Sequence, residues 1–372
     1  MILGFDAKRA FFNRSGLGSY SRNLLNSFFK FYPGNKYILY SPRSKNKIDF
    51  THRDNYILRT PEDTINRVFT SLWRTKGISK QISKDSPDIY HGLSSELPLS
   101  LKKSSIKTLV TVHDLIYMRY PGLYKIIDRN IYFGKTIHAC KHSDHIVAIS
   151  EQTKADIVYF TGTEHNKISV IYQDCHPSFY ATPDEDKKDE LRKKYSLPSE
   201  YLLYVGTIEE RKNLLSIIKA LKISQLEVPL VVVGKKTPYF KKVSSYISRN
   251  NIKNITVLDT MNNEDLPAIY RMAACFIYPS FFEGFGIPII EALVSGVPVI
   301  TSIGSCFREA GGPGSIYVDP SEPEELSEAI VSVINDKSLS SKMISQGKEY
   351  AQRFRAEAIA EQYINLYKSL IE

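Results

Sequence analysis

The chain has little cysteine and no long apolar run. Its four cysteines lie at least 31 positions apart and form no Cys-x-x-Cys pair, which is typical of buried, reduced thiols rather than a disulfide framework. No apolar stretch approaches the roughly 18 to 20 residues of a membrane span, and the start MILGFDAKRAFF reaches charged residues after five positions, unlike a signal peptide. We therefore expect a cytoplasmic protein.

The positive charge of the chain is concentrated in its first half. The whole chain carries 49 Lys and Arg against 40 Asp and Glu, a net charge of +9. Residues 1–176 carry 26 Lys and Arg against 15 Asp and Glu, whereas residues 177–372 carry 23 against 25. This asymmetry indicates an acidic partner for the first half, such as nucleic acid, an anionic membrane or a phosphorylated substrate.

The order of apolar and amphipathic stretches predicts the fold class. Short strand-like runs alternate with helix-like stretches along all 372 residues, the pattern of βαβ units and parallel sheets. The alternation stops in a stretch rich in proline and charge, then restarts at Tyr201. We predict an α/β chain with two doubly wound, Rossmann-like domains that bind ligands at the carboxyl ends of their strands. The predicted parts are a first domain at 1–175, a connector at 176–200, a second domain at 201–352 and a C-terminal helix at 353–372 that packs back on the first domain.

The densest candidate motif is YPSFFEGFGIPIIEALVSGVPVI, residues 278–300. A predicted strand leads into a loop where Gly284 and Gly286 let backbone N–H groups approach a ligand oxygen, just before the start of a helix that favours anions. Glu283 and Glu291 place two carboxylates near the same cleft edge. A turn cap and a surface ion pair are the ordinary alternatives for such a pair of glutamates.

This segment resembles the donor-site motif of the retaining glycosyltransferases of family 4, in the group 1 superfamily, which includes bacterial polysaccharide mannosyltransferase-like members. The resemblance implies the GT-B fold, with two facing Rossmann-like domains, and a nucleotide diphosphate sugar as donor. It implies that Glu291 holds the ribose hydroxyls and that Glu283 lies beside the donor sugar. Backbone groups at Gly284, Phe285 and Gly286 would bind the diphosphate.

A second motif, YVGTIEERKNLLSIIKAL, brings two cations to the start of a predicted helix. Arg211 and Lys212 precede Asn213, a candidate N-cap, and this arrangement suits a diphosphate, although a solvated basic turn would look the same. The loop resembles the diphosphate-binding Arg and Lys of the family. Many relatives carry Arg where this chain has Thr207. The family resemblance also implies base contacts near Gly234 and Lys235.

The first half contains weaker candidates. His113 follows an apolar strand, and the ordinary alternative is a capping or core histidine. The family has a histidine at this strand end that reaches the donor sugar. The loop NRSGLGSYSRNLL contains Gly16 and Gly18 but lacks the third glycine of a dinucleotide fingerprint, which disfavours a nicotinamide site. The resemblance implies that this loop closes over the diphosphate and the acceptor.

Two further patterns imitate metal sites. Asp184, Glu185 and Asp186 form an acidic D-x-D pattern, but they lie in the predicted connector. His138, His142 and His145 have helical spacing but no accompanying acidic or cysteine ligand. We therefore predict no metal and no cofactor.

Residues 65–84 combine the apolar positions Ile65, Val68, Phe69, Leu72 and Trp73 with five cations and no acid. An amphipathic helix packed on the first domain is the ordinary interpretation, and a basic face resting on anionic lipid is the alternative. We predict a retaining hexosyltransferase that moves a hexose, of the mannose or glucose type, from a nucleotide diphosphate sugar to a sugar or lipid-linked saccharide acceptor in surface polysaccharide synthesis. A nucleotide-sugar epimerase or hydrolase on the same fold is the alternative, and a nucleic-acid binder is the hypothesis from a different class.

Overall fold

The computed structural model describes residues 1–13, 16–43, 55–99, 101 and 106–372. It divides the chain into two compact units. Unit 1 contains Met1–Asp174 together with Ala356–Glu372, and unit 2 contains Cys175–Arg355. Each unit is built on one parallel sheet, as the alternating pattern predicted.

Unit 1 has a seven-stranded parallel sheet in the order β3-β2-β1-β4-β5-β6-β7. Its strands are β1 Ile2–Asp6, β2 Lys36–Tyr40, β3 Tyr56–Arg59, β4 Ile89–Gly92, β5 Lys107–Val112, β6 His145–Ala148 and β7 Ile168–Val170. Its α-helices are α1 Lys8–Phe12, α2 Gly16–Phe31, α3 Thr64–Val68, α4 Thr70–Leu72, α5 Ile78–Asp85, α6 Ile116–Arg119, α7 Ile126–His142, α8 Glu151–Thr161 and α17 Ala356–Ile371. A π-helix, η2 Trp73–Gly77, and short 3-10 helices, η3 Pro121–Leu123 and η4 His165–Lys167, complete the unit.

Unit 2 has a six-stranded parallel sheet in the order β10-β9-β8-β11-β12-β13. Its strands are β8 Leu202–Val205, β9 Leu230–Val233, β10 Ile255–Leu258, β11 Cys275–Tyr278, β12 Val299–Ser302 and β13 Ile316–Val318. Its α-helices are α9 Glu185–Tyr195, α10 Leu214–Ser224, α11 Phe240–Arg249, α12 Leu266–Arg271, α13 Ile287–Ser295, α14 Phe307–Gly311, α15 Pro323–Asn335 and α16 Lys337–Ala351. Its 3-10 helices are η5 Pro177–Phe179, η6 Glu210–Lys212, η7 Asn263–Asp265 and η8 Gln352–Phe354.

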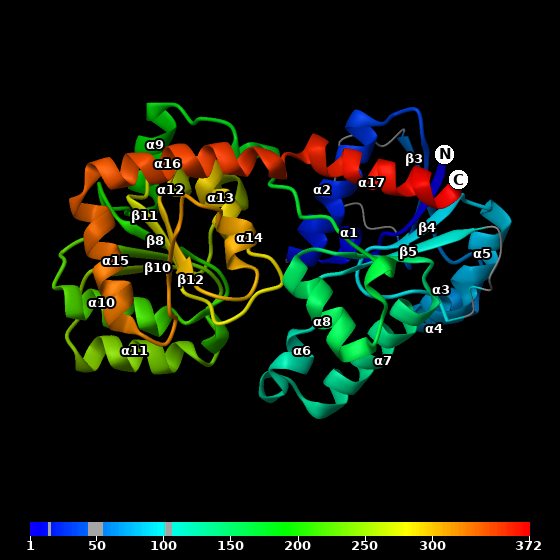
Figure 1. Cartoon of the computed structure of the whole chain (residues 1–372), viewed down its shortest axis with the longest axis horizontal. Helices are drawn as coiled ribbons and strands as arrows, with labels where there is room; N and C mark the ends of the chain where they lie inside the picture. Colours follow the sequence, from blue (N-terminus) through cyan, green and yellow to red (C-terminus); the bar gives the residue numbers. More distant parts are fainter. Residues whose placement is uncertain (14–15, 44–54, 100, 102–105) are drawn as a thin grey trace. The chain divides into compact units, whose positions relative to one another are not determined.

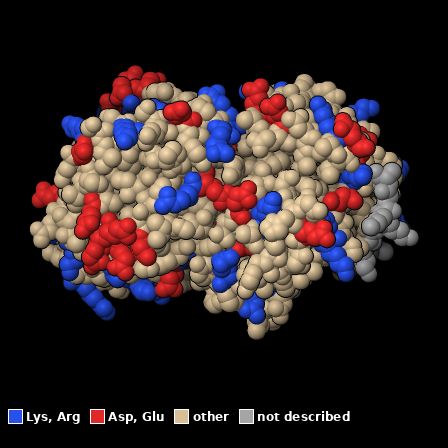
Figure 2. Space-filling model, viewed as in Figure 1, with Lys and Arg blue, Asp and Glu red and all other residues tan. Residues whose placement is uncertain are grey.

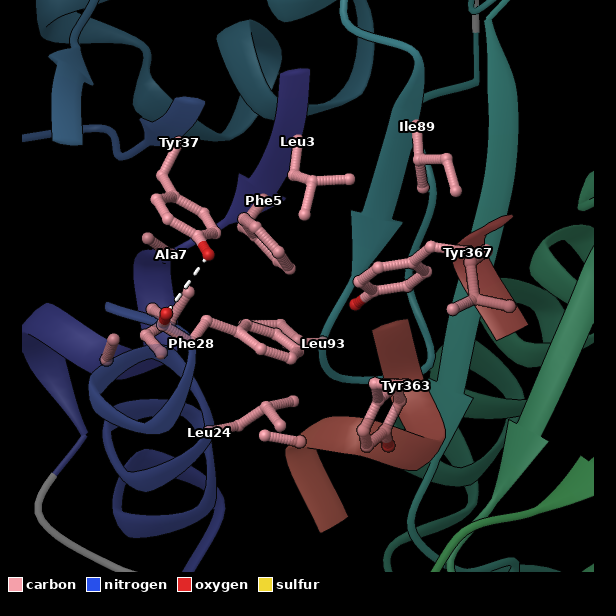
Figure 3. Packing of buried hydrophobic residues seen from close by; sticks show 14 of the residues in the cluster. Leu3, Phe5, Ala7, Leu24, Phe28, Tyr37, Ile89, Leu93, Tyr363 and Tyr367 are labelled. Atoms are coloured by element: carbon pink, nitrogen blue, oxygen red, sulfur yellow. Dashed lines mark hydrogen bonds between the residues drawn. The ribbon is translucent and has the colours of Figure 1, made fainter. Parts of the chain in front are cut away.

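Helix α17, the last of the chain, belongs to unit 1. Figure 1 shows it (red) beside α2 (blue), although more than 300 residues separate the two in sequence. Tyr363 and Tyr367 are fully buried in the same aromatic core as Phe5 and Phe28, and Figure 3 shows their rings directed into it. The C-terminal segment is therefore part of the hydrophobic core of unit 1.

A buried chain of hydrogen bonds joins α17 to the sheet. The Tyr367 hydroxyl lies 2.8 Å from Nδ1 of His91, and Nε2 of His91 lies 2.8 Å from Oγ1 of Thr111. Thr111 lies 3.1 Å from the Tyr20 hydroxyl, which in turn lies 2.7 Å from that of Tyr363. Because a buried polar group without a partner is costly, this network specifies how the last helix docks.

Residues 176–200, predicted as a connector, belong to unit 2 and include helix α9. Asp184 begins that helix, and its Oδ1 accepts a hydrogen bond from the Lys187 backbone N–H at 2.8 Å. The charge-rich composition that suggested a solvated connector thus forms an exposed helix with Glu–Lys and Asp–Arg pairs three residues apart. The D-x-D pattern is a helix start.

The basic segment 65–84 is not one helix. It comprises α3, α4, the π-helix η2 and α5, with the side chains of residues 65, 71 and 76 outside the described part. Trp73 is buried and donates a hydrogen bond to Gln81 Oε1 at 3.0 Å, while Val68 and Phe69 are 64% and 61% exposed. The interruption of the helix places Trp73 in the core and leaves Val68 and Phe69 at the surface, whereas one continuous amphipathic helix was predicted.

Candidate functional site in unit 2

The site of unit 2 forms around one carboxylate. Glu283 follows strand β11, and its Oε2 lies 2.8 Å from Nη1 of Arg211 while its Oε1 lies 3.3 Å from Nζ of Lys212. The Tyr278 hydroxyl donates to Oε1 at 2.7 Å, and the Ser280 hydroxyl donates at 3.0 Å. Two motifs that are about 70 residues apart in sequence therefore meet at the carboxyl edge of the sheet.

The two cations have further fixed contacts. Lys212 Nζ donates to the Tyr278 hydroxyl at 2.6 Å and lies 5.1 Å from the centre of that ring. Arg211 Nη2 lies 2.6 Å from Oε1 of Glu209, and Nη1 also donates to the carbonyl of Phe282. The loop is thus held by charge-assisted hydrogen bonds, which are stronger than neutral ones.

These contacts set the charge of the site. Burial would raise the pKa of Glu283, but the charges of Lys212 and Arg211 outweigh it and hold the pKa at about 2. Burial would lower the pKa of Arg211, but Glu283 and Glu209 hold it above its ordinary value. Glu283 and Arg211 are therefore ionised at neutral pH, and Glu283 cannot act as a proton donor there.

Glu291 lies in helix α13 and has a different environment. Its Oε2 accepts a hydrogen bond from the Tyr270 hydroxyl at 3.0 Å. Burial raises the pKa of Glu291 to about 7, against the smaller lowering effects of Tyr270 and Lys212. Glu283 and Glu291 thus differ by about five pH units in pKa although the same lysine influences both.

The loop between β11 and α13 is held by hydrogen bonds from residues that follow the carboxyl end of β12. Ser305 Oγ lies 3.1 Å from the carbonyl of Glu283, and Cys306 Sγ lies 2.7 Å from the carbonyl of Phe285. Gly286 adopts φ 118°, which favours glycine, and Pro288 lies in the first turn of α13, where its missing N–H costs no hydrogen bond. Phe285 itself is buried, with its ring 5.6 Å from that of Phe354.

The loops after β8 and β9, which contain Gly206 and Gly234, lie against each other. A Cβ at Gly234 would lie 1.9 Å from the carbonyl oxygen of Gly206, so no larger residue fits there. Thr207 and Lys235 are exposed beside this contact, and the carbonyl of Lys235 accepts from the Ile208 N–H at 2.9 Å. The glycine that the resemblance assigned to base contact therefore has a packing role of its own.

One detail of the second motif was wrong. Asn213 stands at the start of α10, but its side chain caps no backbone N–H and instead donates to the carbonyl of Pro320 at 2.6 Å. Its backbone lies in the left-handed region at φ 56°, which moves the side chain away from the helix start. The motif is nevertheless a helix start, because η6 ends at Lys212 and α10 begins at Leu214.

Sequence reasoning assigned no role to Tyr278, Tyr270, Ser280, Ser305 or Cys306. Tyr278 and Ser280 were within the motif quoted for its glycines, and their position at a strand end was an available signal. Tyr270, Ser305 and Cys306 come from other segments, and only the tertiary structure brings them to the two glutamates.

The candidates of unit 1 lie at the carboxyl edge of its own sheet. His113 follows β5, with Nε2 donating to the carbonyl of Leu93 at 2.8 Å and Nδ1 lying 3.2 Å from Nε2 of Gln173. Burial lowers the pKa of His113 to about 4, with a further lowering effect of Arg9, so the ring is neutral at pH 7. Both ring nitrogens have protein partners in this arrangement.

Gly16 and Gly18 were predicted to lie in a loop, but they lie in the first turn of α2. A Cβ at Gly18 would lie 1.8 Å from the carbonyl oxygen of Asn13, so the glycine permits close packing of the chain before the helix. Residues 14 and 15 of the predicted loop lie outside the described residues. Both glycines therefore belong to the start of α2.

The described residues contain no group of three or more His, Cys, Asp or Glu arranged to hold a metal ion. The rings of His138 and His142 lie 4.5 Å apart on α7. Across the described ranges, no helix is both long enough and apolar enough to cross a bilayer.

Comparison with known proteins agrees with this geometry. Residues 187–350 match the model of the glycosyl transferases group 1, and residues 15–173 match that of glycosyltransferase family 4. Together the two models span most of both units. The chain belongs to this glycosyltransferase family. It is an enzyme of the glycosyltransferase class, as predicted.

The glycosyltransferase has curated relatives in bacteria. It is 29% identical over 288 residues to O-antigen chain mannosyltransferase B of Escherichia coli, an alignment that covers 76% of this chain and 74% of the relative. It is 30% identical over 226 residues to O-antigen chain mannosyltransferase RfbU of Salmonella typhimurium, covering 60% of each chain.

Solved structures establish the fold. HepE of Anabaena, in complex with UDP and glucose, superposes with a TM-score of 0.74 at 17% identity over 99% of each chain. WaaG, a glycosyltransferase involved in lipopolysaccharide biosynthesis, superposes with a TM-score of 0.73 at 15% identity, also over 99% of each chain. The glycosyltransferase therefore has the GT-B fold that the motifs implied.

Proposed function

We propose that this glycosyltransferase transfers a hexose, most specifically mannose, from a nucleotide diphosphate sugar to a saccharide acceptor in the assembly of a bacterial surface polysaccharide. The observation that carries the proposal is the cluster of Arg211, Lys212 and Glu283 at the carboxyl edge of unit 2. The names of the mannosyltransferase relatives support the choice of sugar and of pathway class.

The charges of the cluster suggest how it assists the reaction. Negative charge develops on the diphosphate as the bond to the sugar breaks, and Arg211 and Lys212 are fixed cations that can stabilise it. The backbone around Gly284 to Gly286, before the start of α13, adds N–H donors. Because these groups supply the positive charge, we propose that transfer needs neither metal nor cofactor.

We propose a retaining reaction in which Glu283 and His113 position and polarise the donor sugar. Glu283 stays ionised because of its low pKa, and His113 stays neutral because of its burial, so neither is suited to donate a proton at pH 7. The leaving phosphate would then accept the acceptor's proton. We place the ribose hydroxyls at Glu291, whose carboxyl oxygen faces the Tyr270 hydroxyl.

Two experiments test this proposal. A thermal-shift screen against guanosine, uridine and adenosine diphosphates identifies the base, since a ligand at 100 times its Kd stabilises a protein by about 2.7 kcal/mol. Transfer from the matching donor to a mannose-containing oligosaccharide is then followed by NMR, where an unchanged anomeric configuration is expected. Rapid release of free or epimerised sugar without acceptor would instead support an epimerase or hydrolase.

A nucleic-acid binder is disfavoured by the surface charge. On the face seen in Figure 2, Lys and Arg side chains lie in small groups among Asp and Glu side chains rather than in one continuous basic band. The first half has a net charge of +11, which any polyanion would attract. Tight, salt-sensitive binding to a random duplex would contradict our assignment.

We also propose that unit 1 associates with the cytoplasmic face of an anionic membrane. Helix α7 exposes Ile126 at 66%, Ile127 at 68% and Ile131 at 49%, a set of large apolar side chains at the surface beside Lys125 and Lys135. Exposed apolar side chains next to lysines suit an interface with anionic lipid. Such contact would bring a lipid-linked acceptor to the enzyme.

Flotation with liposomes tests the membrane proposal. Changing Ile126, Ile127 and Ile131 to Asp should abolish flotation with anionic phosphatidylglycerol vesicles. Ile223→Asp, on the exposed face of α10 in unit 2, is the matched control and should float like the unchanged protein. Equal flotation of all three proteins, or none by the unchanged protein, would contradict the proposal.

A further inference from the structure

A group of cations lies at the carboxyl end of strand β1 in the unit 1 sheet, and one of them, Arg9, is close enough to His113 to lower the pKa of that histidine. Lys8 and Arg9 begin α1, immediately after strand β1, and Arg74 comes from the π-helix η2. Ligands of open parallel sheets bind at this edge, and π-helical turns occur frequently at functional sites. None of the proposed donor contacts uses these three residues.

Arg74 is neutralised by two carboxylates. Its Nη2 lies 2.6 Å from Oδ2 of Asp6, the last residue of β1, and 2.9 Å from Oε2 of Glu96. Glu96 also lies 3.2 Å from Nζ of Lys135. Asp6 and Glu96 are therefore already paired with Arg74, whereas Lys8 and Arg9 add further positive charge near the end of β1.

Lys8 and Arg9 differ from Arg74. Among the described residues, neither side chain makes a hydrogen bond or ion pair, although both are partly buried, and the Nε atoms of Arg9 and Arg74 are buried without an acceptor. Burial and the charges of Arg74 and Arg9 lower the pKa of Lys8, against the opposing effects of Glu96 and Asp6. Partly buried cations crowded in this way are stabilised when an anion binds between them.

The segment that carries them is rigid. The Ala7 N–H donates to the Tyr40 carbonyl at 2.9 Å, and the Lys8 N–H donates to Oδ1 of Asp6 at 3.1 Å. At the other end of α1, Arg22 Nη1 donates to the carbonyls of Ala10 at 2.9 Å and Asn13 at 2.7 Å. The backbone that carries the two cations is thus anchored at both ends of α1.

We infer that Lys8 and Arg9 bind an oxyanion carried by the acceptor, next to the place where His113 would contact the transferred sugar. This inference rests on the proposed function and names the part of the acceptor that unit 1 recognises. The oxyanion is either the diphosphate of a lipid-linked saccharide or the carboxylate of a uronic acid. Both present negatively charged oxygen atoms that Arg and Lys bind.

The first experiment compares acceptors. Wild type, Lys8→Gln and Arg9→Gln receive the same mannosyl oligosaccharide with a neutral octyl aglycone, with a polyprenyl diphosphate, or with a terminal uronic acid. We expect each variant to raise KM at least tenfold for the one anionic acceptor that the protein uses, and to leave KM for the neutral acceptor and for the donor unchanged. Lys36→Gln, at the opposite edge of the same sheet, is the matched control.

A second experiment is independent of catalysis. Trp73, the single tryptophan of the chain, is adjacent to Arg74 and reports on this edge. Titration of the full chain with inorganic pyrophosphate should change Trp73 fluorescence in the wild type and in Lys36→Gln. In Lys8→Gln and Arg9→Gln, at least tenfold more pyrophosphate should be needed for the same change.

The outcomes separate the inference from the proposed function. Equal KM changes for neutral and anionic acceptors, a raised donor KM, or unaltered pyrophosphate binding in the variants would each overturn the oxyanion site while leaving a working transferase. Absence of transfer to every acceptor, with pyrophosphate binding at Lys8 and Arg9 intact, would overturn the proposed function alone. Circular dichroism confirms that the variants are folded.

Discussion

Both units place cations at the carboxyl edge of their sheets, but the cations of the two units differ in their carboxylate partners. In unit 2, Arg211 and Lys212 both contact Glu283, and the mutual attraction lowers the pKa of that carboxyl to about 2. In unit 1, no carboxylate of the described residues forms an ion pair with Lys8 or Arg9, and burial together with the charge of Arg74 lowers the pKa of Lys8. The paired set is preorganised before a ligand arrives, whereas the unpaired set gains most when an anion binds.

The comparison predicts the largest effect at Arg211. Arg211→Ala should lower kcat by about 10²- to 10³-fold, about 3 to 4 kcal/mol in the transition state, because it removes a donor aimed at developing charge. Steady-state kinetics with saturating acceptor measures this. Lys222→Ala, an exposed change on α10, should leave kcat unchanged. If Arg211→Ala raised only the acceptor KM, the difference between the units would disappear.

The next effect concerns Glu291. Glu291→Ala should weaken donor binding by about 1.5 to 3 kcal/mol, or roughly 10- to 150-fold, because hydrogen bonds from sugar hydroxyls to a carboxylate are lost. Isothermal titration with the donor nucleotide measures it. Glu328→Ala, exposed on α15, should bind like the unchanged protein. Unchanged affinity in Glu291→Ala would show that the ribose lies elsewhere.

Acid should affect unit 1 through its buried histidines. Burial lowers the pKa of His113 to about 4 and that of His91 to about 3, so the unfolded chain binds protons that the folded unit does not. The contribution of each histidine to the free energy of unfolding is fully present above the ordinary histidine pKa of 6.5 and is lost as the pH falls toward 4. Between pH 7 and 5 the loss is about 2 kcal/mol per histidine. Urea unfolding followed by Trp73 fluorescence measures it.

Variants sharpen this result. His113→Asn should flatten the decline of the urea midpoint between pH 7 and 5, whereas His165→Asn, in the exposed helix η4, should not. Glu283 is expected to add an acid-sensitive contribution in unit 2 only below about pH 4.5, because its pKa is lowered. Identical pH profiles for wild type and His113→Asn would show that the histidine is solvated in the folded protein.

The smallest expected effect is that of a chelator. Transfer should proceed at an unchanged rate in excess EDTA, because the guanidinium and ammonium groups of unit 2 supply the positive charge that a metal would otherwise supply. A rate measured after dialysis against EDTA, with and without added Mg²⁺, checks this. Loss of activity that Mg²⁺ restores would show that fixed cations alone do not suffice.

The sequence by itself determined the fold class, the two parallel sheets and the strand–loop–helix context of Glu283 and Glu291. Alternating apolar runs and the local chemistry of glycine and proline depend on near neighbours, so they can be read along the chain. It missed the edge strands β3 and β13, which are short and only partly buried. The mixed-charge stretch that contains α9 was also misread, because propensity alone does not reveal which surface a helix covers.

Only the tertiary structure decided which charges meet. Arg211 and Glu283 are about 70 positions apart, Cys306 contacts the loop that carries Glu283, and Tyr270 contacts Glu291 in α13. The two glutamates therefore have opposite pKa shifts: burial raises the pKa of Glu291, whereas the charges of Lys212 and Arg211 outweigh burial at Glu283 and lower its pKa. Such differences arise from desolvation and distance, which depend on packing between segments remote in sequence and are not visible in the local pattern.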